Sequence, residues 1–150
     1  MSYDELLRSR RIRRENVSQA DVRAAMDLAE RDLRVARQMA DQELDWAFAI
    51  GYNAVLQASR AYLFSQGFRP ASADSHKNTL AFMQVALGEE HRRLVAYFDR
   101  ARRKRHRVVY DQAGTVSERE AHDLLARAEE FLALVRQGLG GTGRASPEPE

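Results

Sequence analysis

Apolar residues recur every three or four positions along most of this chain, the spacing that places them on one face of a helix. The pattern runs through residues 22–40, 76–87, 94–108 and 121–135. The first of these stripes is the most regular and consists of Val22, Ala25, Met26, Ala29, Leu33, Ala36 and Ala40. Each of the four stretches is therefore predicted to be an amphipathic helix.

A further stretch, residues 46–63, is apolar around most of its circumference when drawn as a helix. Its large residues are Trp46, Phe48, Ile50, Tyr52, Val55, Leu56, Tyr62 and Leu63. A helix that is apolar on more than one face lies at the centre of a protein or is shared with another subunit. We expect these aromatic residues to be core residues, and Gly51 to permit the close approach of a neighbouring backbone.

Capping and breaking residues mark the ends of the expected helices. Ser18 or Asp21 can cap the helix that begins near residue 22. The segment Gly67-Phe68-Arg69-Pro70 ends the central helix. Ser117 and Glu120 have the spacing of a capping box for the last helix, which is expected to stop at 138–141.

The expected fold is all-α, an antiparallel bundle of four to five main helices. No stretch of four or more residues alternates apolar and polar positions between turn signals, so no strand is predicted. The bundle is expected to occupy residues 18–138. Residues 1–17 should form a basic arm or a short helix, and residues 139–150, which contain two prolines, a disordered tail.

The composition narrows the class of protein. A chain of 150 residues is long enough to form one domain with its own core. The sequence has no cysteine and no apolar run of membrane-spanning length, so we expect a cytoplasmic protein without a membrane partner. No metal site or cofactor is predicted, because no His and carboxylate residues have ligand spacing and there is no glycine-rich phosphate loop.

Positive charge is concentrated in two clusters, although the net charge is only +2. Residues 8–14 contain five arginines, and residues 92–107 contain eight lysines or arginines. Such clusters favour binding to a polyanion or an acidic protein. The alternative is that they are solvated faces of ordinary helices.

Within the second cluster, Arg105 falls on the apolar stripe formed by Leu94, Phe98, Ala101 and Val108. A guanidinium on a buried face is costly unless it has a partner. Two interpretations stay open: an ion pair with an acidic residue of another helix, such as Asp45 or Asp99, or a role in binding a ligand.

The sequence Arg105-His106-Arg107-Val108-Val109-Tyr110 resembles the signature of HEPN domains, small prokaryotic helical bundles in which an arginine followed by a polar residue precedes a histidine. The likeness extends over residues 22–137. Further landmarks are Trp46, Tyr52-Asn53-Ala54, Gly67-Phe68-Arg69-Pro70, His76-Lys77 and Tyr110-Asp111. In this register Arg105 matches the family arginine and His106 its polar neighbour, whereas Tyr110 stands in the place of the histidine.

The resemblance implies a homodimer whose motif lies near the interface. It also implies either a metal-independent ribonuclease toxin or a partner of a nucleotidyltransferase or antitoxin. In the family chemistry, arginine binds the scissile phosphate and histidine transfers a proton. The candidate catalytic residues are thus Arg105, His106 and Tyr110. The candidate RNA-binding residues are Arg100, Arg102, Arg103, Lys104 and Arg107.

Three functions stay open on this basis. The replacement of histidine by Tyr110 favours a binding module for RNA or a protein, because phenols are poor bases at neutral pH. An active nuclease would need His106 or Tyr110 to transfer protons, and Arg100 with His106 fits the looser form of the family spacing. The third possibility is a structural scaffold. His76, at a helix start, is expected near the basic cluster but is more typical of a surface or capping residue.

Overall fold

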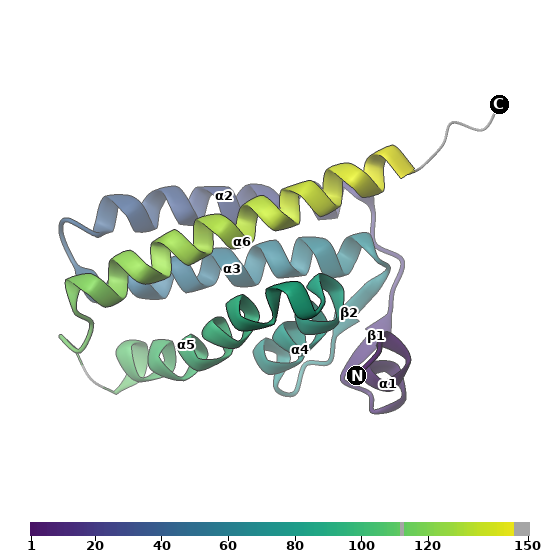
Figure 1. Ribbon diagram of the computed structural model, residues 1–150, viewed down its shortest axis with the longest axis horizontal. Coiled ribbons are helices and arrows are strands. Elements are labelled where there is room, and N and C mark those ends of the chain that lie inside the picture. The colour runs from purple at the N-terminus through teal and green to yellow at the C-terminus, as the bar shows by residue number, and fades with distance from the viewer. Residues whose placement is uncertain (112, 146–150) are drawn as a thin grey trace.

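The computed structural model describes residues 1–111 and 113–145, with side chains described as far as Gly140 (Figure 1). Its main elements are the helices α2 (Gln19–Met39), α3 (Leu44–Ser65), α4 (Ser75–Leu87), α5 (Arg92–Tyr110) and α6 (Glu118–Ala145). A short helix α1 (Tyr3–Arg8) precedes them, and the 3-10 turn η1 (Glu89–His91) joins α4 to α5. The expectation of an all-α, HEPN-like helical bundle is confirmed.

Helix α3 is the centre of the bundle. It packs against α2, α4, α5 and α6, and Figure 1 shows α2, α3 and α6 side by side with α4 and α5 along one flank. Most of its residues are buried, as the apolar pattern predicted. A Cβ atom at Gly51 would lie 2.6 Å from Cδ2 of Leu124, so this glycine lets α6 approach closely.

Trp46 is an exception among the aromatic residues of α3. Tyr52 is fully buried, but Trp46 is 51% exposed, so the prediction that it belongs to the core is wrong. It lies in the first turn of α3. A periodic pattern assigns faces but does not show where covering elements end.

The N-terminal segment forms α1 and then a strand, which the sequence did not predict. Strand β1 (Ile12–Arg14) pairs antiparallel with β2 (Phe68–Pro70), and Arg13 lies opposite Arg69. Three residues are too few to display alternation, and the pairing joins segments more than fifty residues apart. Ile12 is buried there, so the strand fixes the arm onto the bundle.

Both capping predictions are confirmed. The hydroxyl of Ser18 accepts a hydrogen bond from the backbone amide of Asp21 at the start of α2. Ser117 and Glu120 each accept the other's backbone N–H before α6, as a capping box requires.

The end of α6 differs from the expectation. The helix does not stop at 138–141 but continues to Ala145, so 139–145 of the expected tail are helical. A glycine costs a helix only about 1 kcal/mol relative to alanine, and a Cβ at Gly138 would lie 3.6 Å from the ring of Tyr62. Residues 146–150 of the expected tail lie outside the described residues. None of the described helices has both the length and the apolar character needed to cross a membrane.

Candidate functional site

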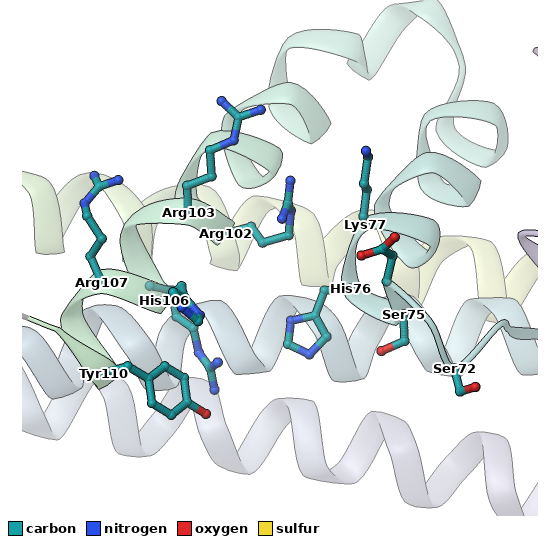
Figure 2. Close-up of a pocket in the computed structure, with 11 residues that line it drawn as sticks. Ser72, Ser75, His76, Lys77, Arg102, Arg103, His106, Arg107 and Tyr110 are labelled. Atoms are coloured by element: carbon teal, nitrogen blue, oxygen red, sulfur yellow. The ribbon is translucent and has the colours of Figure 1, made fainter.

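An open pocket of about 840 Å³ lies between the start of α4 and the second half of α5. Figure 2 shows side chains of both helices around it. Its lining consists of Ser72, Asp74, Ser75, His76, Lys77, Arg102, Arg103, Arg105, His106, Arg107 and Tyr110. We call it the first pocket.

Six of the eight candidate residues predicted from the sequence line the first pocket: Arg102, Arg103, Arg105, His106, Arg107 and Tyr110. Lys104 does not. It forms a 2.7 Å ion pair with Glu120 and donates a hydrogen bond to the carbonyl of Thr115, so it joins α5 to the start of α6. Arg100 lines a separate cavity that also includes Tyr97 and Asp123.

Arg105 is a partly buried residue of α5 that lines this pocket. Its Nη2 donates a hydrogen bond to Oδ1 of Asn53 on α3, at 3.3 Å. Its Nε is buried and has no hydrogen-bond partner among the described residues. A buried donor without a partner normally costs about 1–3 kcal/mol, and such groups are rare in folded proteins.

The two carboxylates considered as partners of Arg105 are used elsewhere. Asp45 accepts hydrogen bonds from the backbone amides of Gly114 and Val116, at 2.5 and 3.3 Å. Asp99 pairs with Arg102 on its own helix, at 3.4 Å. Within the described part of the chain Arg105 forms no ion pair, so the structural interpretation of this residue as an ion-pair partner fails there.

His106 and Tyr110 lie on the same exposed side of α5. Their ring centroids are 4.9 Å apart with the planes tilted by 45°, and Tyr110 is 66% exposed. Positions five apart on a helix do not share a face. Arg105 and Tyr110 nevertheless line one pocket, because it extends around α5 to the helix end.

His76 enters the pocket from the first turn of α4. Asp74, which precedes this helix, has a left-handed conformation (φ 55°) that turns the chain into α4. The His76 ring is half-buried, with its centroid 6.0 Å from that of Tyr52. Burial lowers the pKa of His76, and the positive charges of Arg105, Arg102 and Arg60 lower it further. This histidine is therefore neutral at neutral pH.

Sequence analysis did not identify His76 as a candidate catalytic or RNA-binding residue. Its only signals were the preceding loop and the neighbouring Lys77, and a single histidine at a helix start is common on protein surfaces. Its place beside Arg105 results from the packing of α4 against α5.

The first pocket is strongly positive. Its lining includes five lysine or arginine side chains and one carboxylate, that of Asp74. Of the five, only Arg102 forms an ion pair with a described residue. The N-terminus of α4 also opens onto the pocket and adds the partial positive charge of a helix start. The arrangement is suited to binding anions.

The described segments contain no group of three His, Asp or Glu side chains that could together hold a metal ion.

No curated protein matches this sequence. The family model described as HEPN domain matches residues 22–138, well over half of the chain, and includes both α4 and α5 with their pocket residues. This chain therefore belongs to the HEPN domain family.

Proposed function

We propose that this HEPN domain binds RNA through its phosphate groups at the first pocket and does not cleave it. The observation that carries the proposal is the environment of Arg105. Its Nε is buried with no hydrogen-bond partner among the described residues, and Arg105 lines a pocket with four more cationic side chains. A phosphate oxygen would accept a hydrogen bond from this guanidinium, and such charge-assisted bonds are among the strongest in proteins.

The pocket is open enough to admit a polymer. Arg103 and Arg107 are exposed, and in Figure 2 their side chains extend away from His76. They can follow a phosphate backbone beyond the part held by Arg105. The exposed rings of His106 and Tyr110 offer surfaces on which bases can stack.

The residues favour binding over cleavage. RNA hydrolysis of this kind needs a group that accepts a proton from the 2′-hydroxyl. Tyr110 occupies the position of the family histidine, and a phenol is a poor base at neutral pH. The site therefore keeps the family's phosphate-binding residue and lacks its proton-transfer residue.

A binding experiment tests this function. Fluorescence anisotropy with a labelled single-stranded RNA of about twelve nucleotides would compare the unmodified chain with Arg103→Gln/Arg107→Gln. The matched control is Arg23→Gln/Arg34→Gln, which removes two exposed arginines of α2 that do not line the pocket. We expect affinity to fall at least tenfold for the first pair and to change little for the second. Equal losses for both pairs, or no binding by the unmodified chain, would contradict the proposal.

A second candidate function is metal-independent ribonuclease activity, and the observation that favours it is His76. A neutral histidine beside Arg105 is placed to accept a proton that Tyr110 accepts poorly. The test is to incubate total RNA in EDTA with the unmodified protein, with Arg105→Ala and with His76→Gln, and to compare RNA cleavage among the three. Cleavage by the unmodified chain alone would establish the nuclease and reject binding without cleavage, and intact RNA in every lane would reject the nuclease.

Association with other proteins is a separate part of the proposal. Homodimerisation, and pairing with a nucleotidyltransferase or an antitoxin, follow from the family resemblance and stay predictions.

A further inference from the structure

A second pocket, of about 440 Å³, adjoins the first. Its lining includes the four arginines Arg13, Arg60, Arg69 and Arg105, together with Ser75 and His76. None of the residues that line it is acidic. Ser75, His76 and Arg105 line both pockets, so the two share a wall.

We infer that the second pocket binds a further phosphodiester group of the same RNA strand, with Arg105 and His76 between the two bound phosphates. The ligand class is accordingly single-stranded RNA that spans both pockets. A mononucleotide would fill one of them. This inference rests on the proposed function and adds a subsite to it.

The N-terminal arm supplies one of the arginines of the second pocket. Strand β1 pairs with β2 so that Arg13 lies opposite Arg69, and both side chains line the pocket. Arg13 lies outside residues 22–138, the part of the chain that the HEPN family model matches. The subsite therefore depends on a segment that this chain adds to the family domain.

The arginine side chains are held in place by neighbouring residues. The guanidiniums of Arg60 and Arg69 both lie over the ring of Phe64, at 5.4 and 4.7 Å from its centroid. Glu15 accepts a hydrogen bond from Nε of Arg69 and lies 3.5 Å from Nη2 of Arg13. Ordering before binding lowers the entropy that each long side chain loses when a ligand binds.

The balance of charge in the second pocket stays positive. Glu15 is the one described carboxylate paired with its arginines, whereas Arg13, Arg60, Arg69 and Arg105 carry four positive charges. Neither Arg60 nor Arg105 has an ion-pair partner among the described residues. A phosphate continuous with one in the first pocket would balance these charges without a second ligand.

The test uses the salt dependence of RNA binding by the full chain. For single-stranded nucleic acid, each neutralised phosphate contributes about −0.7 to the slope of log K against log salt concentration. Arg13→Gln and Arg60→Gln should each reduce the magnitude of the slope by about 0.7 and weaken binding several-fold at low salt. Both side chains are exposed, so folding, checked by the thermal midpoint, should be retained.

Arg8→Gln is the matched control. It removes an exposed arginine of the same N-terminal segment that lines neither pocket, and we expect its slope to equal that of the unmodified chain. If Arg13→Gln and Arg60→Gln behave like Arg8→Gln while Arg103→Gln/Arg107→Gln loses affinity, the second subsite is rejected and the proposed function stands. If the unmodified chain binds no RNA, both are rejected.

Discussion

Arg105 on α5 reaches across to α3 and donates a hydrogen bond from its Nη2 to Oδ1 of Asn53, at 3.3 Å, while its Nε is buried without a partner in the described structure. The neutral amide of Asn53 orients the guanidinium and leaves its charge uncompensated. A carboxylate at that position would have satisfied the charge. The hydrogen bond from Arg105 to Asn53 thus orients an uncompensated guanidinium at the wall shared by the two pockets, where it can bind an anion.

Replacing Arg105 with alanine should lower the affinity for RNA and leave the stability of the fold nearly unchanged. We expect RNA affinity to fall at least tenfold, because a charge-assisted hydrogen bond is worth about 1.5–3 kcal/mol. The unfolding free energy should change by less than about 1 kcal/mol, because the single hydrogen bond lost is offset by removal of an unsatisfied buried donor. Anisotropy and chemical denaturation measure the two quantities. Arg34→Ala, on the exposed side of α2, is the control, and a comparable loss of affinity there would contradict the assignment.

Asn53→Asp should have opposite effects on stability and binding. The new carboxylate is nearly the same size as the amide and would pair with Arg105, so the protein should be stabilised by about 1 kcal/mol. RNA affinity should fall, because the guanidinium charge is then neutralised within the protein. Gln42→Glu adds the same charge at an exposed position between α2 and α3 that lines neither pocket, and it should change stability and RNA affinity little. A variant Asn53→Asp that binds RNA as well as the unmodified chain would show that Arg105 does not contact phosphate.

His76 should make the folded state sensitive to acid. Its pKa is lowered in the folded protein, so between that value and the ordinary histidine value the unfolded chain binds more protons. The contribution of His76 to stability is therefore present above pH of about 6.5 and is lost as the pH falls below it. Denaturation at pH 8 and pH 5.5 should show a smaller loss of unfolding free energy for His76→Gln than for the unmodified chain.

Gly51 should not tolerate a larger side chain. A Cβ atom there would lie 2.6 Å from Cδ2 of Leu124 and 3.1 Å from Cδ2 of Leu125. Gly51→Val would force α3 and α6 apart or displace both leucines, and overpacking of this kind costs about 1–3 kcal/mol. Gly140→Ala is the control, because nothing lies within 4 Å of the added Cβ; it should be neutral or slightly stabilising. Thermal denaturation distinguishes them, and a Gly51→Val protein as stable as the unmodified chain would show that the interface repacks freely.

The helices and their caps could be predicted from local sequence patterns. A period of three and four residues is a local property of the chain, and so are the caps formed by Ser18 and by Ser117 with Glu120. The buried face of the basic helix was also predicted correctly, since Leu94, Phe98 and Ala101 are buried as their spacing indicates. These features depend on residues close together in sequence.

Which charged residues form the site depends on how the helices and strands pack together. Lys104 forms an ion pair with Glu120, and Arg105 donates a hydrogen bond to Asn53. The start of α4 places His76 in the same pocket as the residues of α5. The pairing of β1 with β2, which adds Arg13 to the second pocket, joins segments that are far apart in the chain. Each of these contacts depends on how whole elements pack, and the free energy of a buried charge is set by the neighbours that packing supplies. Local periodicity carries no information about those neighbours.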